Sequence, residues 1–109
     1  MKRVVVESPY AGDVARNVAY EKAAVRDCLT RGEAPIASHL LFTQPGVLRD
    51  EVRADRTLGI AAGHAWISVA DLVAFYTDFG MSSGMVGARK VAERLGVQME
   101  TRSLPPGTF

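Results

Sequence analysis

Two short, unbroken runs of apolar residues constrain the fold of this chain most strongly. Residues 4–6 (VVV) form the first run, and residues 71–76 (DLVAFY), apolar after the initial aspartate, form the second, which stops at a turn-like segment. A strand with one solvent-facing side alternates apolar and polar residues, whereas a strand covered on both faces reads as a continuous apolar run. The two runs therefore predict the central strands of a parallel sheet.

Helical patterns separate these two runs. Asp13 is a suitable N-cap for a helix predicted over residues 14–31, and a glycine follows its end. Apolar residues at helical spacing predict a second helix from Leu48 to Val69, interrupted by two glycines. Ser82 and Ser83 can cap a third helix, whose core-facing residues run from Val86 to Leu95 and which Gly96 ends.

Two further strands complete the predicted sheet. Residues 34–37 (APIA) contain a proline, which lacks the N–H of a central strand, and residues 97–102 alternate as edge strands do. The alternation of strands and helices predicts a three-layer α/β/α fold, flavodoxin-like or Rossmann-like, with a four-stranded parallel sheet of order 2-1-3-4. We expect residues 1–102 to form one domain and residues 103–109 an extended C-terminal tail.

Composition narrows the function classes. The 109 residues carry 13 basic and 12 acidic side chains, so no global charge favours nucleic acid or an anionic membrane. The single Cys28 permits no intramolecular disulfide, and no cluster of ligands predicts a metal site. No apolar run is long enough to span a bilayer, and we expect a cytoplasmic protein.

Ligands of parallel sheets bind at the carboxyl ends of the strands, where the strand order reverses. Here that crevice lies between the loops that follow the first and third strands. The aromatic ring of Tyr10 can stack on a base, and the N–H groups of residues 82–84 can hold a phosphate at a helix N-terminus. The candidate ligand-binding residues are Ser8, Pro9, Tyr10, Gly12, Ser38, Gly80, Ser82, Ser83, Gly84 and Met85.

Three residues are candidates for acid–base catalysis. Asp78 follows the third strand and Glu7 ends the first, so either carboxylate can act in the crevice. His39 lies beside Ser38 and can serve as an acid or as a hydrogen-bonding group. His64 falls on the second helix, away from the expected crevice, and receives no role.

The strand-end loops resemble those of a known family. Residues 6–10 (VESPY), 32–39 (GEAPIASH) and 78–85 (DFGMSSGM) are similar to the nucleoside 2-deoxyribosyltransferase-like superfamily. The chain looks most like a small branch, common in phage and bacterial genomes, that is carried as a domain of unknown function. The resemblance covers nearly the whole domain. It implies binding of a nucleoside or nucleotide and cleavage of its N-glycosidic bond, with transfer of the deoxyribosyl group to another base or to water.

Carried over by position, residues 8–10 match the turn under the base and sugar, and residues 83–85 match the turn that starts the last helix. The nucleophilic glutamate of the superfamily falls at Ala88, and an aspartate of the same turn is replaced by Ser82. Alanine can neither form a glycosyl-enzyme intermediate nor activate water. Catalysis would then need a carboxylate from elsewhere in the crevice, whereas binding can survive the change.

Three function classes stay open. The first is an enzyme that breaks or exchanges an N-glycosidic bond, and the second is a module that binds or sequesters a nucleotide without turnover. The third is a protein-interaction domain anchored by Trp66 and Phe109. The resemblance also implies a homodimer or higher homo-oligomer in which Arg53 or Arg56 of a neighbouring subunit completes an anion site. No cofactor is expected.

Overall fold

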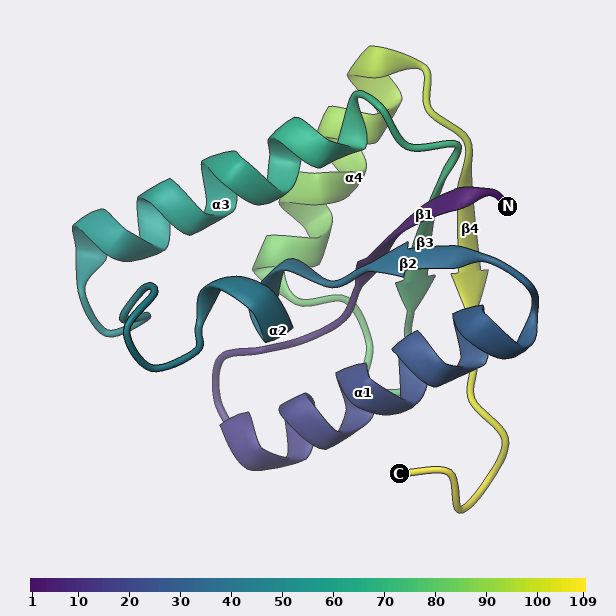
Figure 1. The fold of residues 1–109 in the computed structure, drawn as a ribbon, viewed down its shortest axis with the longest axis horizontal. Coiled ribbons are helices and arrows are strands. Elements are labelled where there is room, and N and C mark those ends of the chain that lie inside the picture. The colour runs from purple at the N-terminus through teal and green to yellow at the C-terminus, as the bar shows by residue number, and fades with distance from the viewer.

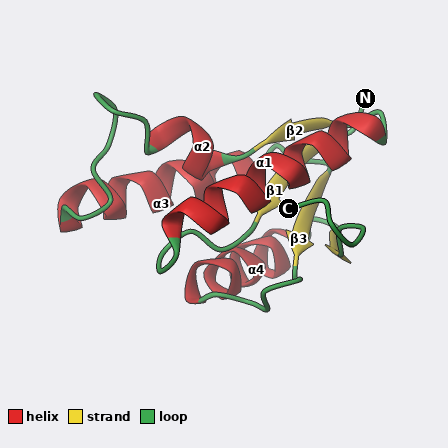
Figure 2. Ribbon diagram, turned by 90° about the horizontal axis from the view of Figure 1, so that it is seen from below, coloured by secondary structure: helices red, strands yellow, loops and turns green.

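The computed structural model describes residues 1–109 as three layers, with a parallel sheet between helices (Figure 1). Helix α1 covers one face of the sheet, and α3 and α4 cover the other, as the views in Figures 1 and 2 agree. The elements in chain order are β1 (Arg3–Glu7), α1 (Val14–Thr30), β2 (Ala34–Ile36), α2 (Ser38–Phe42), α3 (Arg53–Ile67), β3 (Leu72–Tyr76), α4 (Ser83–Leu95) and β4 (Met99–Arg102).

The sheet has the order β2-β1-β3-β4, and each neighbouring pair is parallel. In this register Val5 lies opposite Val73, and Glu7 at the end of β1 lies opposite Phe75. The predicted fold class and strand order are confirmed. Because β1 and β3 are central, their carboxyl ends meet in the middle of one edge of the sheet, where the strand order reverses.

Side-chain alternation along the central strands builds two separate cores. Val4 and Val6 pack with Tyr20 and Cys28 of α1 on one face. Val5 packs with residues of α3 and α4 on the other face. All five residues of β3 are buried, which explains why its sequence shows no alternation. Cys28 is fully buried on the α1 side of the sheet.

The segment between β2 and β3 differs from the prediction. The expected helix from Leu48 to Val69 is shorter, since α3 begins at Arg53, and a short helix, α2, precedes it. Gly46 adopts a positive φ of 86° in the intervening loop, which a helix does not permit. Leu48 packs against α3, where a Cβ added to Gly59 would lie 3.2 Å from its Cδ1. The apolar spacing of Leu48 therefore reflects a loop packed against a helix.

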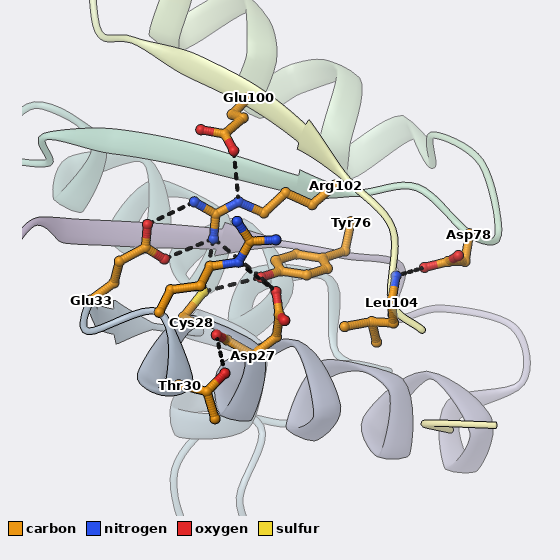
Figure 3. Close-up of polar contacts among 10 residues, drawn as sticks. Asp27, Cys28, Thr30, Glu33, Tyr76, Asp78, Glu100, Arg102 and Leu104 are labelled. Carbon is orange, nitrogen blue, oxygen red and sulfur yellow. Dashed lines mark hydrogen bonds and ion pairs between the residues drawn. The ribbon is translucent and has the colours of Figure 1, made fainter. Parts of the chain in front are cut away.

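The end of β4 carries a buried ion pair. The guanidinium of Arg102 donates to both carboxylate oxygens of Glu33, at 2.7 Å each (Figure 3). Beside it, the hydroxyl of Tyr76 donates to Asp27 at 2.7 Å. The side chain of Arg102 is 3% exposed. The pair links the edge strand β4 to the α1–β2 connection.

Residues 103–109 return to the face covered by α1. Leu104 is buried, and its N–H donates to Asp78 at 2.9 Å (Figure 3). The ring of Phe109 contacts those of Tyr20 and Phe79, with centroids 4.8 and 5.2 Å apart. None of the helices combines the length and the apolar character that a transmembrane span requires.

Candidate functional site

A cavity of about 350 Å³ lies at the carboxyl ends of the strands. Its walls come from the end of β1, from α2, from α3 and from the first two turns of α4. This volume falls within the range of pockets that hold small molecules. The cavity occupies the edge of the sheet where the sequence places the crevice.

Glycines on two facing helices form part of the cavity wall, those of α3 in close contact with Leu48 and Ser38 and those of α4 beside open space. Gly59 and Gly63 of α3, and Gly84 and Gly87 of α4, all line it. A Cβ at Gly87 would meet only the ring of His64, at 4.0 Å. Where both helices lack side chains, the backbones form the wall and leave room for a ligand.

A stacked pair of rings forms one side of the cavity. The ring centroids of Tyr10 and His39 are 4.6 Å apart, with an angle of 14° between the ring planes. Burial lowers the pKa of His39, and the nearby Asp50 opposes this effect. The imidazole is therefore neutral at pH 7, with one nitrogen that donates and one that accepts a hydrogen bond.

The N-terminus of α4 forms another part of the wall. Ser82 is the N-cap, and its hydroxyl accepts from the N–H of Met85 at 3.3 Å. The N–H groups of Ser83 and Gly84 lie in the first helical turn, where the helix supplies no acceptor. Arg56 of α3 also lines the cavity. A helix N-terminus and a guanidinium together favour an anionic group.

Two carboxyl groups lie at the end of β1. Burial raises the pKa of Glu7, which lines the cavity, to about 8. Burial also raises the pKa of Glu21 to about 8, and the neighbouring Glu7 adds to this effect. Glu21 belongs to α1, is 1% exposed, and neither of its carboxyl oxygens has a hydrogen-bond partner. Near neutral pH this pair holds protons that exposed carboxyl groups would have lost.

The structure places Asp78 outside the cavity, contrary to the prediction. Its carboxylate accepts from the hydroxyl of Tyr20 at 2.7 Å and from the N–H of Leu104 at 2.9 Å. Its own N–H donates to the Tyr20 hydroxyl at 2.9 Å. These contacts fasten the β3–α4 loop and the C-terminal residues to α1, which is a structural task.

Most other predicted ligand-binding residues do line the cavity. They are Ser8, Tyr10, Ser38, Ser82, Ser83, Gly84 and Met85, together with Glu7 and His39. Pro9, Gly12 and Gly80 do not. Gly12 and Gly80 have φ values of 99° and 80°, so they shape the turns that carry their neighbours.

Several residues in or beside the cavity were not predicted from the sequence, among them His64, Arg56 and Glu21. His64, expected to lie away from the crevice, lines it because α3 runs along the cavity. Arg56 lines the cavity of its own chain, where the sequence analysis expects it from a neighbouring subunit. Glu21 carries a signal, since it occupies the inward side of α1 between the buried Asn17 and Ala24. A carboxylate on the buried face of a helix is uncommon in a structural core.

Ala88, at the position of the superfamily's nucleophilic glutamate, lies in the hydrophobic core. Ala88 is fully buried in the core formed by Val5, Phe75 and Met85, and it does not line the cavity. Helix α4 therefore contributes backbone N–H groups and hydroxyls to the cavity, with no carboxylate.

Comparisons with known proteins support the fold and identify the family. The chain is similar in structure to a protein described as a 2-desoxiribosyltransferase from Leishmania mexicana, with a TM-score of 0.66 and 12% sequence identity. The match covers 96% of this chain and 66% of that one, so this chain spans just under two thirds of its length. No curated protein matches the sequence. The expected resemblance to deoxyribosyltransferases is thus confirmed for the fold. The profile of a domain of unknown function, DUF7768, matches residues 2–102, and the chain therefore belongs to this family.

Proposed function

We propose that this protein binds a nucleoside 5′-monophosphate in the cavity at the carboxyl end of its sheet. The observation that carries the proposal is the presence in one cavity of a stacked Tyr10–His39 pair and the free N–H groups of the α4 N-terminus. The aromatic pair suits the flat face of a base, and the helix N-terminus suits a phosphate. The likeness in fold to a deoxyribosyltransferase supports the same ligand class.

Isothermal titration calorimetry with nucleosides and their 5′-monophosphates tests this proposal. We expect monophosphates to bind more tightly than the matching nucleosides, because only they reach the α4 N-terminus and Arg56. Ser83→Ala should weaken monophosphate binding by about 1 kcal/mol, the usual value of one hydrogen bond, and leave nucleoside binding unchanged. Equal affinities for nucleoside and monophosphate would contradict the phosphate assignment.

One observation favours a second candidate function, the hydrolysis of the N-glycosidic bond. Glu7 lines the cavity with its pKa raised to about 8, so it is protonated at neutral pH, as a general acid must be. In this reaction Glu7 gives its proton to the leaving base as the bond to C1′ breaks. A water molecule forms the new bond to C1′, and one of its protons returns to Glu7.

Chromatography of nucleosides and monophosphates incubated with the purified protein tests this reaction. Release of free base by the wild-type protein, and its loss in Glu7→Gln, would support hydrolysis. Glu93→Gln is the matched control, because it removes an exposed carboxylate on α4 outside the cavity. Binding without base release would leave the non-catalytic module as the function.

We further propose that the chain forms a homodimer through α3. Only Gly63 and Ile67 of this helix are buried, whereas Leu58, Ile60 and Trp66 are between 47% and 60% exposed. Exposed apolar residues gathered on one helix are typical of a surface that another chain covers. We expect light scattering to give the mass of two chains and Trp66→Lys to give that of one. A monomeric wild-type protein would contradict this part of the proposal.

A further inference from the structure

Two polar side chains near the end of β1, those of Ser8 and Glu21, stand out because three of their oxygens lack hydrogen-bond partners inside the protein. Neither carboxyl oxygen of Glu21 has a partner at hydrogen-bond geometry, and the hydroxyl of Ser8 is likewise unpaired, although it lies close enough to Glu21 to lower the pKa of that carboxyl group. Both residues are more than nine-tenths buried, with 1% and 3% of their surfaces exposed. Buried polar groups are almost always hydrogen-bonded, so the unpaired hydroxyl of Ser8, which lines the cavity, points to a group that arrives from outside. Ser8 and Glu7 line the cavity, which gives such a group access.

The chemistry of the cluster selects among ligand groups. A phosphate is disfavoured, since two carboxyl groups and no cation surround it here. An ammonium group would need ionised carboxylates, whereas burial keeps the pKa values of Glu7 and Glu21 near 8. A hydroxyl both donates and accepts, so it can pair with a carboxyl group in either protonation state and with the Ser8 hydroxyl. Two adjacent hydroxyls would form more hydrogen bonds with these groups than a single hydroxyl would.

The order of the strands places this cluster between the other two parts of the cavity. Strand β1 lies between β2 and β3 in the sheet. His39 follows β2, Glu7 ends β1 and is followed by Ser8 and Tyr10, and Ser83 follows β3. Along the edge of the sheet the cavity therefore presents an aromatic pair, then the carboxyl groups, then a helix N-terminus. A nucleotide has the same order, with its sugar between the base and the phosphate.

We propose that Glu7 and Ser8, with Glu21 behind them, form a subsite for the 2′,3′-hydroxyl pair of a ribose, and thereby make the protein selective for ribonucleotides. Glu7 and Ser8 contact the hydroxyls, because they line the cavity. Glu21 is a positioning residue, since it does not line the cavity and acts on Glu7 across a short distance. This inference rests on the proposed function.

Calorimetry with three forms of one nucleoside 5′-monophosphate, the ribo, 2′-deoxy and 2′,3′-dideoxy forms, tests the subsite. We expect the wild-type protein to bind the ribo form roughly tenfold or more tightly than the dideoxy form, because two hydrogen bonds are lost. Glu7→Gln, Ser8→Ala and Glu21→Gln should each reduce that ratio. The ratio is the informative quantity, since a variant that only loosens the fold would weaken all three ligands alike.

Each outcome distinguishes this inference from the function on which it rests. A wild-type protein that binds all three forms with equal affinity would overturn the subsite and leave nucleotide binding intact. A protein that binds none of the three would overturn both. Glu93→Gln, which removes an exposed carboxylate on α4, should retain the wild-type ratio. If Glu21→Gln fails to fold, Ser8→Ala decides the question, because it removes a single hydroxyl from the cavity wall.

Discussion

A buried carboxyl group without partners has a measurable effect on stability. Below about pH 4.5 Glu21 is protonated in both the folded and the unfolded chain, so its ionisation does not change the free energy of unfolding. As the pH rises toward 8 the unfolded chain releases this proton and the folded chain retains it, so the free energy of unfolding falls. The same sign holds for Glu7, whose pKa is also raised to about 8.

We therefore predict that Glu21→Gln stabilises the protein in alkaline solution. The gain should be a few kcal/mol above pH 8 and should shrink as the pH approaches 4.5, where the carboxyl group is neutral as well. Urea unfolding of both proteins across this range measures the difference. Glu93→Gln serves as the control, since its exposed side chain should give a small difference. A difference for Glu21→Gln that does not change with pH would contradict the assigned cause.

The sequence predicts which residues line the cavity where those residues stand at the end of a recognisable strand. Glu7, Ser8 and Tyr10 follow a recognisable strand, and they line the cavity as expected. Asp78 follows the other central strand, but the same reasoning places it wrongly. Its carboxylate is held by Tyr20, a residue 58 positions away, and no local pattern reveals such a distant partner.

Helix α4 lines the cavity with two glycines, Gly84 and Gly87, and glycines within a helix lower its stability. Glycine in a helix costs about 1 kcal/mol relative to alanine, so Gly87 weakens α4. We predict that Gly87→Ala raises stability by roughly 0.5–1 kcal/mol, because the added Cβ meets only His64 at 4.0 Å. Thermal unfolding checks this gain. Larger side chains at this position, such as valine, should fill the cavity and reduce nucleotide binding.

The edge strand β4 depends on one ion pair for its attachment to the α1–β2 connection. Glu33→Gln leaves the buried guanidinium of Arg102 with only the half-exposed Glu100 as a charge partner, and we expect this loss to cost roughly 3 kcal/mol. We predict a destabilisation of this size by urea unfolding. Asp71→Asn removes the exposed pair between Arg3 and Asp71, where we expect a much smaller loss. Similar losses in both variants would show that burial does not govern the Arg102 pair.

Elements with a strong local signal are the ones that the sequence predicts. The central strands, α1 and α4 follow from continuous apolar runs and from helix caps such as Asp13 and Ser82. Helix α2 does not, because five residues are too short to show a helical period. The apolar pattern of α3 also continues into the preceding loop, because Leu48 contacts the helix without belonging to it.

At the scale of the whole molecule, the C-terminal residues belong to the core on the α1 side. Leu104 is buried there, and the ring of Phe109 closes over Tyr20 and Phe79. We predict that deletion of residues 103–109 lowers the free energy of unfolding by about 3 kcal/mol or more, since a buried leucine alone accounts for 2–5 kcal/mol. Calorimetric unfolding measures the loss. Leu104→Ala should account for most of it, and an unchanged transition would contradict the role of these residues.

The scarcity of buried residues on α3 bears on how a ligand enters. A helix fastened mainly by Gly63 and Ile67 has few contacts to lose when it separates from the rest of the chain. Its amide protons should exchange with deuterium far sooner than those of β3, whose five residues are all buried. A ligand that bridges α3 and α4 would slow this exchange, and part of its binding energy would be spent on ordering that wall. The measured affinity would then understate the strength of the contacts themselves.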